Sequence, residues 1–558
     1  MEESTTLLSV LVRQSRQFAS RTALSIRDRG QWRELSYSAL TDRSTSLAEA
    51  LIERGVGGGS RVLLLCESRP EWVIGFFAIL LAGGVAVPVD PKLDPEELSA
   101  ILAHSGAEAV LASRQTESEA EGLASTTPGP VRVLLIDELD AMYVESELDA
   151  DAAALRIRDR QPADVVLMSY TSGTTGTPKA VMITLANLLF EISALCRSHG
   201  LNENDRFLSI LPLNHLLELT CGLLTPLHVG AEVVYASTLF PGEIVELLAE
   251  KRITTLIGVP LFFRLLHQSI EAQMARSLSS RTYFRVAGMV VSLIPLQRLR
   301  RALYSPVQKA LGGSIRRFIS GGSPLDRRAA LFFERMGLPL FQGYGLSETS
   351  PVATVNRPGA NRAGSVGQPL GNSEVRIDDP QTGTGEVLVR GPHVMKGYFR
   401  DEKLTARTID ADGWLHTGDI GRIDDGYLYI TGRLKSLIVL PDGRKVQPEE
   451  VESVISQSNL IKEVCVSSSC ATSGPRAGCE EVCAVVVPSD AAIQSWGSSP
   501  AMLHSEIANE ITRLAAKLRD YKRPSSVVVR EAELPRTTTR KVRRLEVQRW
   551  LIDRESTR

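Results

Sequence analysis

Short apolar runs alternate with helical patterns along most of this sequence, and the alternation limits the fold more than any other feature. RVLLLCES, GVAVPVD, GAEAVLAS and VRVLLID are typical of buried strands, and DPEELSAILAHSG, which lies between two of them, is typical of a helix. Strands that alternate with helices favour parallel sheets covered by helices. We therefore predict an α/β fold in which a large N-terminal domain contains parallel-type sheets flanked by helices.

Charge and composition exclude several classes of protein. The 558 residues are 43% hydrophobic, which is ordinary for a globular chain and excludes disordered and fibrous proteins. Lys and Arg number 63 against 65 Asp and Glu, for a formal charge of −2. A nucleic-acid binder usually has a basic excess, so we expect no nucleic-acid partner.

The cysteines do not form a disulfide framework, because there are only seven in so long a chain and seven is an odd number. We therefore expect a reducing compartment. Four of them lie near one another, but their spacings do not match zinc-ligand patterns. We predict structural roles for this set, which comprises Cys465, Cys470, Cys479 and Cys483.

Neither the N-terminus nor the most apolar run is typical of a targeting or membrane-spanning segment. The first residues, MEESTTLLSVLVRQSRQF, are acidic and lack the basic start of a signal peptide. The run Trp72–Val89 is interrupted by Gly83, Gly84 and Pro88, which predicts a buried helix followed by a short strand. We expect a cytoplasmic protein.

A change in composition near GYLYITGRLKSLIVLPDGRKVQPEEVE indicates a domain boundary. Glycine gives the backbone freedom at a joint, so we place the boundary at Gly432. The predicted domains are residues 1–432 and 433–558.

The stretch 274–301 is basic and also apolar. Hydrophobic residues alternate there with Arg276, Arg281, Arg285, Arg298, Arg300 and Arg301. Such a segment can lie on an anionic membrane surface, which would make the protein peripheral at the inner membrane face. A solvated helical excursion is the alternative.

The loop YTSGTTGTPKA, residues 170–180, is the strongest local signal for a ligand. It is rich in hydroxyl side chains and glycine, it ends in a lysine, and the apolar runs VVLM and VMIT flank it. Hydroxyls, backbone N–H groups and a lysine are suited to a polyphosphate. It is not a Walker loop, because Ala180 rather than Ser or Thr follows Lys179.

This loop and five further motifs resemble the adenylate-forming superfamily of acyl-CoA synthetases, luciferases and adenylation domains. The other motifs are SGGSPL, QGYGLSETSP, GWLHTGDIG, GRLKSLIV and LPRTTTRKVRR, and they follow in the family's order. The resemblance covers nearly the whole chain and is greatest to bacterial long-chain fatty acyl-CoA ligases. It implies an N-terminal ATP- and acyl-binding domain with an added small distorted barrel, and a mobile α+β catalytic C-terminal domain.

The resemblance also implies which residues bind ATP and magnesium. Glu348 would hold Mg²⁺ through a carboxylate oxygen, which is a ligand that this cation prefers. The implied contacts to the phosphates, the adenine and the ribose are made by Thr171, Ser172, Gly173, Thr174, Thr175, Lys179, Gly322, Gln342, Gly343, Tyr344, Ser347, Asp419 and Arg433.

Four residues are the implied catalytic group. Lys541 resembles the lysine that reaches the carboxylate and the α-phosphate, although Arg540 stands where the family usually has glycine. Lys435 would be the hinge, Glu348 the metal ligand and His215 a gate beside the carboxylate. The chemistry depends on positioning and on cationic stabilisation of phosphoryl charge.

The segment LPLNHLLELTCGLLTPLHVGA resembles the acyl pocket of long-chain enzymes, and its leucines predict an apolar lining for a medium- or long-chain fatty acid. Only 75 positions separate Tyr344 from Asp419, which leaves no room for the insertion of carrier-protein ligases and favours coenzyme A as the acceptor. Transfer to an acyl carrier protein and a catalytically inactive binding relative are the alternatives.

Overall fold

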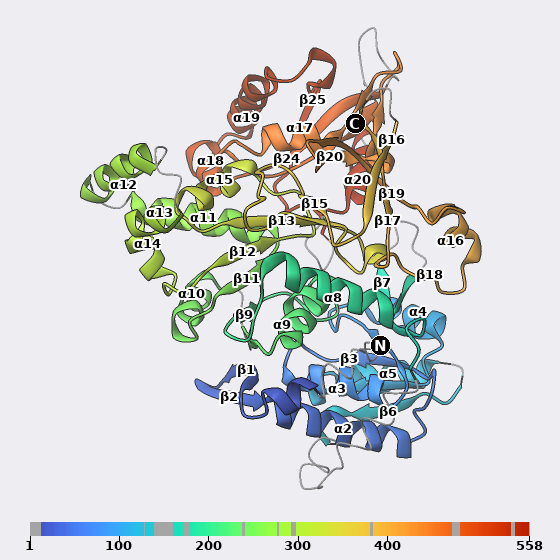
Figure 1. Ribbon diagram of the computed structural model, residues 1–558. Coiled ribbons are helices and arrows are strands. Elements are labelled where there is room, and N and C mark those ends of the chain that lie inside the picture. Colours follow the sequence, from blue (N-terminus) through green and yellow to red (C-terminus); the bar gives the residue numbers. More distant parts are fainter. Residues whose placement is uncertain are drawn as a thin grey trace. The chain divides into compact units, whose positions relative to one another are not determined.

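Figure 1 shows the computed structural model of this chain. The structure describes residues 13–127, 129–138, 160–171, 178–236, 240–275, 278–291, 297–379, 383–470, 480–536 and 542–556. The chain forms two compact units: unit 1 comprises Met1–Val375 and Val389–Leu415, and unit 2 comprises Arg376–Leu388 and His416–Arg558. The boundary expected at Gly432 falls inside β20 (Tyr427–Arg433), and the domain limits stay a prediction.

A seven-stranded sheet forms one half of unit 1, in the order β18-β8-β7-β4-β3-β5-β6. Its strands are β3 (Arg61–Leu65), β4 (Val85–Pro88), β5 (Ala109–Ala112), β6 (Arg132–Leu135), β7 (Val165–Thr171), β8 (Lys179–Thr184) and β18 (Gly397–Tyr398). Strands β3 to β7 pair in parallel, whereas β8 runs antiparallel to both β7 and β18. The sheet is therefore mixed, because the seven residues between β7 and β8 are too few for a parallel crossover.

The apolar run Trp72–Val89 forms α3 (Pro70–Leu81) and then β4, as predicted. Every residue of α3 is buried, and proline at its first position suits a helix start. The connection needs glycine: Gly83 has φ +87°, and a Cβ on Gly84 would lie 3.1 Å from the carbonyl oxygen of Ser60. Among the described residues, no helix has the length and apolarity that crossing a bilayer requires.

A nine-stranded sheet forms the other half of unit 1, in the order β15-β14-β13-β12-β11-β9-β10-β1-β2. Its strands are β1 (Thr22–Asp28), β2 (Gln31–Ser36), β9 (Arg206–Ser209), β10 (Glu232–Tyr235), β11 (Thr255–Gly258), β12 (Arg317–Ser320), β13 (Leu340–Tyr344), β14 (Thr354–Val355) and β15 (Gln368–Pro369). Six neighbouring strands of this sheet are parallel, namely β13, β12, β11, β9, β10 and β1. Their carboxyl ends consequently lie along one edge of the sheet.

The helices of unit 1 lie between and beside its strands (Figure 1). They are α2 (Tyr37–Glu53), α4 (Pro95–Ser105), α5 (Glu117–Thr126), α8 (Leu185–His199), the π-helix η2 (Leu217–Leu224), α9 (Thr225–His228), α10 (Pro241–Glu250), α11 (Pro260–Met274), α12 (Leu278–Val291), α13 (Gln297–Leu303), α14 (Ser305–Ala310), α15 (Arg327–Arg335) and α16 (Glu402–Thr408). Helix α8 begins at a capping box made by Thr184 and Asn187 and ends at Gly200 in the left-handed conformation, so its sequence defines both ends.

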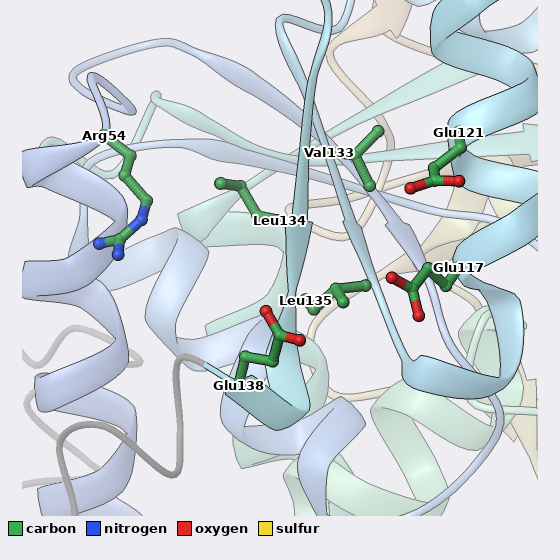
Figure 2. Close-up of a pocket in the computed structure, with 7 residues that line it drawn as sticks. All are labelled: Arg54, Glu117, Glu121, Val133, Leu134, Leu135 and Glu138. Atoms are coloured by element: carbon green, nitrogen blue, oxygen red, sulfur yellow. The ribbon is translucent and has the colours of Figure 1, made fainter.

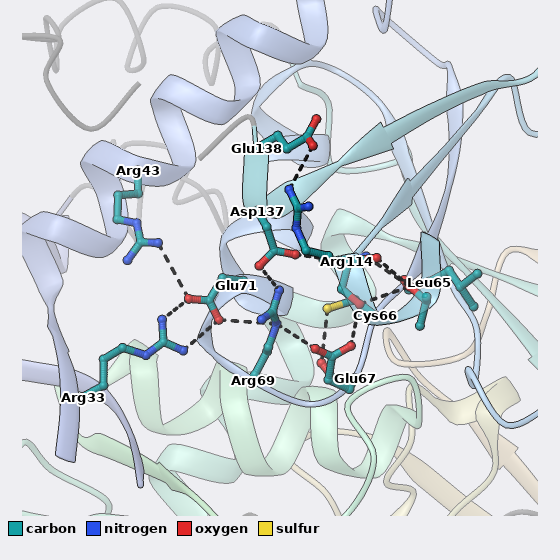
Figure 3. A network of polar contacts seen from close by, with 12 residues as sticks. Arg33, Arg43, Leu65, Cys66, Glu67, Arg69, Glu71, Arg114, Asp137 and Glu138 are labelled. Carbon is teal, nitrogen blue, oxygen red and sulfur yellow. Dashed lines mark hydrogen bonds and ion pairs between the residues drawn. The ribbon is translucent and has the colours of Figure 1, made fainter. Parts of the chain in front are cut away.

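A carboxylate at the start of α3 joins three elements of unit 1 (Figure 3). Glu71 pairs with Arg33 of β2, with Arg43 of α2 at 3.8 Å and with Arg69 at 3.5 Å. Burial alone would raise the pKa of Glu71, but the hydrogen bond and charge of Arg33 and the charge of Arg69 hold it below its ordinary value. Glu71 is therefore an anion that fastens β2 and α2 to α3.

Unit 2 contains most of the four-stranded sheet β16-β17-β19-β20 and all of a three-stranded sheet, β23-β24-β25. Its elements include β17 (Gly385–Arg390), β19 (Leu415–Asp424), β21 (Ile438–Val439), β22 (Lys445–Val446), α17 (Pro448–Ile455), β23 (Ile461–Cys470), β24 (Glu480–Pro488), α18 (Asp490–Trp496), α19 (Pro500–Ala515), β25 (Ser526–Val529) and α20 (Arg544–Ser556), with β16 (Glu374–Asp378) beginning in unit 1. The small distorted barrel stays a prediction.

The cysteines of unit 2 pack as strand residues. Cys465 and Cys483 are buried in β23 and β24, as expected for structural cysteines. Cys479 lies outside the described residues. Within the described part of the chain, no three His, Cys, Asp or Glu side chains gather as a metal-binding group.

Candidate functional site

The carboxyl edge of the nine-stranded sheet gathers several residues predicted from the sequence. Gly322 follows β12, and Gln342, Gly343 and Tyr344 end β13. Because Ser320 pairs with Gln342, these two strand ends lie side by side. Ligands of open α/β sheets bind at the carboxyl ends of their strands, so this edge is the candidate nucleotide site.

The backbone at this edge is bare because glycine recurs there. Gly322 has φ +84°, and a Cβ placed on it would meet nothing within 4 Å. A Cβ on Gly345 would lie 2.0 Å from the carbonyl oxygen of Pro351, so only glycine fits this close approach. The open backbone at Gly322 leaves room for a flat ring or a phosphate, whereas Gly345 lets the chain pass close to Pro351, and the edge therefore fits a nucleotide.

The carboxylate predicted to bind magnesium is held by a tyrosine. Glu348 lies in the short helix η3 (Ser347–Thr349), one residue after Ser347, and its Oε1 accepts a hydrogen bond from Tyr398 Oη at 2.7 Å. Burial and the nearby Glu348 charge raise the pKa of Tyr398, so the phenol stays a donor. A carboxylate oxygen suits Mg²⁺, and this contact fixes its orientation.

The same tyrosine connects Glu348 to the predicted phosphate loop. Tyr398 lies in β18 and pairs with Val181 of β8, the strand that begins at Lys179. On the other side of β8, Lys179 pairs with Thr171 of β7. Unit 1 therefore brings β8, the strand that begins at Lys179, beside the turn that contains Glu348 (residues 345–352, the Glu348 turn). Ser172, Gly173, Thr174 and Thr175, which lie between those two strands, are outside the described residues.

Buried side chains anchor the far end of the Glu348 turn. Glu191 of α8 accepts a hydrogen bond from the backbone N–H of Val352 at 2.5 Å, and Thr220 donates to the carbonyl oxygen of Ser350 at 3.3 Å. Burial raises the pKa of Glu191, against the opposing effect of the Val352 N–H. No motif indicates these contacts or the role of Tyr398, because the partners are 50 to 161 residues apart along the chain.

The segment predicted to bind the acyl chain, residues 211–231, contains His215. This half-buried residue starts the helical segment, since its carbonyl oxygen accepts from the backbone N–H of Leu219 at 2.9 Å. Leu217 faces the nucleotide edge, because a Cβ on Gly321 would lie 3.2 Å from its side chain. The other leucines expected to line the pocket pack instead into the core of unit 1, since the helix is covered on several sides; they are Leu216, Leu219, Leu223 and Leu224.

An uncompensated acid lies in the same helix. Glu218 is fully buried, and neither of its carboxyl oxygens forms a hydrogen bond among the described residues. Burial raises its pKa from 4.5 to about 8, although the nearby Ser209 hydroxyl lowers it somewhat. At neutral pH, Glu218 is therefore a neutral acid and offers no anion to a substrate amine.

In unit 2, β19 and β20 bring together the two predicted ribose-binding residues. Asp419 and Arg433 are a register pair, and Arg433 Nε donates to Asp419 Oδ1 at 2.8 Å. Asp419 is buried, whereas Arg433 is exposed. Lys435 is exposed in the short helix η4 (Leu434–Ser436). Lys541, the predicted catalytic lysine, lies outside the described residues.

A cavity of about 310 Å³ lies elsewhere in unit 1, between α5 and β6 (Figure 2). Its lining residues are Arg54, Glu117, Glu121, Val133, Leu134, Leu135 and Glu138. Three carboxylates against one guanidinium would repel a nucleotide polyphosphate, so this cavity is distinct from the candidate site.

Comparison with known proteins identifies the family. The model of the AMP-binding enzyme family matches residues 11–399, and that of the AMP-binding enzyme C-terminal domain matches residues 450–541. This chain belongs to the AMP-binding, adenylate-forming superfamily. It is an acid–thiol ligase of that superfamily.

The chain is similar to CoA ligases that are named for different acid substrates. It is 33% identical over 468 residues to the long-chain-fatty-acid–CoA ligase FadD15 of Mycobacterium bovis, covering 78% of this chain and 76% of that protein. It is 32% identical over 465 residues to 4-coumarate–CoA ligase 1 of Oryza sativa subsp. japonica, covering 77% and 75%.

Solved structures share the fold over nearly the whole chain. A crystal structure of ATP-bound MatB from Rhodopseudomonas palustris matches with a TM-score of 0.78 at 25% identity, covering 99% of this chain and all of that chain. The o-succinylbenzoate CoA synthetase of Bacillus subtilis, in complex with its acyl-adenylate OSB-AMP, matches with a TM-score of 0.76 at 26% identity, covering 97% of both chains.

Proposed function

We propose that this protein activates a medium- or long-chain fatty acid as acyl-AMP, with release of pyrophosphate, and then transfers the acyl group to the thiol of coenzyme A. The observation that carries the proposal is a set of contacts in unit 1. Strand β18 pairs with β8, and its Tyr398 donates to Glu348 at the carboxyl edge of the nine-stranded sheet, where Gly322 leaves the backbone open. Long-chain-fatty-acid–CoA ligases among the relatives support the choice of acid and acceptor.

In this proposal, unit 1 binds ATP at the edge described above. The bare backbone at Gly322 and Gly343 accepts the adenine, with Tyr344 beside it, and Ser347 donates to the α-phosphate. Lys179 and the loop before it hold the β- and γ-phosphates. Glu348 holds Mg²⁺, which would supply positive charge to the phosphates, and Tyr398 keeps the carboxylate in place.

The residues of unit 2 complete the proposed reaction. Asp419 binds the ribose hydroxyls, and Arg433, now its ion-pair partner, contacts the same sugar. The substrate carboxylate attacks the α-phosphorus, the bond to pyrophosphate breaks, and Lys541 neutralises the charge that develops on the phosphoryl oxygens. Lys435 acts as the hinge between this step and thioester formation.

The helix after His215 supports an apolar acid as the substrate. Leu217 lies at the nucleotide edge, and Glu218 is buried and neutral, so this helix supplies no carboxylate for an amino-acid substrate. Each methylene that leaves water contributes about 0.8 kcal/mol, which favours longer chains. His215 stands as the proposed gate beside the carboxylate.

A panel of carboxylic acids tests this function. Purified enzyme with Mg²⁺ and ATP should release pyrophosphate with fatty acids of medium and long chain, and much less with coumarate, malonate, o-succinylbenzoate or amino acids. Mass spectrometry with coenzyme A or acyl carrier protein as acceptor then separates the two kinds of thiol. Activity confined to an aromatic or dicarboxylic acid would overturn the substrate class, and absence of pyrophosphate release with every acid would indicate an inactive binding relative.

Lys541→Ala separates the two half-reactions. The variant should lose acid-dependent pyrophosphate release but still convert supplied acyl-AMP and coenzyme A to thioester. Its matched control is Lys517→Ala, which removes a cation of unit 2 that has no proposed role. Retention of pyrophosphate release by Lys541→Ala would contradict the proposed role.

A further inference from the structure

Helix α12 (Leu278–Val291) presents apolar side chains to solvent. Its inward side consists of Phe284, Ala287 and Val291; Ala287 and Val291 are buried, and Phe284 stacks on Tyr304 with ring centroids 5.8 Å apart. The opposite side carries Val286 and Met289, whose exposed fractions are 49% and 61%. A helix that packs on a protein core normally has polar residues on that outer side.

Further exposed apolar side chains occur on α12 and on α13 (Gln297–Leu303). Tyr283 and Val290 are also exposed on α12, and Leu299 is exposed on α13. Figure 1 shows α12 and α13 next to each other, beside α11 and α14 at one edge of unit 1. Clustered exposed apolar side chains mark an interaction surface, whereas scattered ones do not.

The stretch of sequence that contains α12 and α13 carries charges of a single sign, and Glu271 at the end of α11 is the acid next to it. From Ala272 to Leu325 the sequence contains no Asp or Glu, although the chain as a whole has a formal charge of −2. The same stretch contains nine cations: Arg276, Arg281, Arg285, Arg298, Arg300, Arg301, Lys309, Arg316 and Arg317. Arg281, Arg285 and Arg298 are exposed on α12 and α13 themselves. A partner that is negatively charged and also accepts apolar side chains therefore fits this surface.

We propose that α12 and α13 dock this protein on the surface of an anionic phospholipid bilayer. Val286, Met289, Val290 and Leu299 enter the boundary between headgroups and acyl chains, and the neighbouring arginines pair with lipid phosphates. A second copy of the chain fits the surface poorly, because a symmetric contact would bring two sets of like charges together. Docking of this kind is the same whichever acid the enzyme activates.

Vesicle sedimentation of the full chain, without ATP or acid, tests this docking. The protein should sediment with phosphatidylcholine vesicles that contain phosphatidylglycerol, should bind pure phosphatidylcholine far less, and should be released by high salt. The double variant Val286→Ser/Met289→Ser should weaken binding by about tenfold, and Arg285→Gln by about fivefold. Acid-dependent pyrophosphate release, measured without vesicles, should stay at the wild-type level in each variant.

Matched controls use residues of the same type on other surfaces. Met502→Ser removes a methionine of α19 that is 55% exposed, and Arg407→Gln removes an exposed arginine of α16. Both should bind vesicles as the wild type does. Equal binding by the α12 variants and their controls would overturn the proposal, as would absence of binding to anionic vesicles. A dimer in analytical ultracentrifugation that Met289→Ser disrupts, with no vesicle binding, would instead assign the surface to self-association.

Discussion

The buried acid Glu218 makes the stability of this protein depend on pH in a direction opposite to that of ordinary paired carboxylates. Its pKa is 4.5 in an exposed state and about 8 in the folded protein. Between these values the folded chain keeps a proton that the unfolded chain releases, so the free energy of unfolding falls as pH rises. Below pH 4.5 both states are protonated, and the penalty disappears.

The magnitude follows from the same two pKa values. In the window between them, each pH unit changes the free energy of unfolding by about 1.4 kcal/mol. Glu218→Gln keeps the shape but cannot ionise. The wild type should therefore lose about 2 kcal/mol of stability relative to this variant between pH 6 and pH 8, after allowing for partial ionisation near the upper value.

Urea unfolding followed by tryptophan fluorescence measures this difference, with both proteins compared at each pH. Comparison with the variant cancels the contributions of other groups, such as the buried His199, whose pKa is lowered to about 4. Glu246→Gln, at an exposed position of α10, is the matched control and should show no such change. A constant difference between wild type and Glu218→Gln from pH 6 to pH 8 would show that the Glu218 carboxyl is hydrated or paired in solution.

Three further substitutions test the site and its support. Tyr398→Phe removes the hydrogen bond to Glu348, worth about 1.5–3 kcal/mol for a charged acceptor, so the Mg²⁺ concentration for half-maximal pyrophosphate release should rise about 10- to 100-fold; unchanged Mg²⁺ dependence would contradict the contact. Gly345→Ala places a Cβ against the carbonyl of Pro351 and should abolish pyrophosphate release while far-UV circular dichroism stays unchanged. Gly242→Ala is the control, because a Cβ there meets nothing within 4 Å and its φ, like that of Gly345, is not positive. Glu71→Gln should destabilise unit 1 by about 2 kcal/mol at pH 7, measured by urea unfolding. The lowered pKa of Glu71 means that this loss should shrink as pH falls through that pKa, and a loss that persists at acid pH would point to packing instead.

Much of the fold was predictable because its signals are local. The strand runs at residues 61–68 and 106–113 and the glycine-interrupted run from Trp72 were assigned correctly, since burial and chain breaking leave a pattern in a few adjacent residues. The antiparallel return of β8 was not predicted. Its cause, the short connection after Thr171, could have been found by counting residues.

Residues of the candidate site were predictable only where they belong to a short sequence motif. Glu348 and Asp419 were named from their motifs, but Tyr398 and Glu191 act through partners that are distant in the sequence. Four leucines after His215 were expected to line a pocket and pack in the core instead, because an apolar pattern does not show which surface will cover it.

The position of Tyr398 in the chain has a consequence for truncated fragments. Strand β18 comes late in unit 1, after the segment Arg376–Leu388 that belongs to unit 2, yet it lies against β8 and holds Glu348. A fragment that ends before residue 398 would contain the phosphate loop and the Glu348 turn but would leave one edge of β8 unpaired and the carboxylate without its tyrosine. An emerging nascent chain therefore cannot assemble the complete magnesium-binding arrangement until synthesis has passed this point.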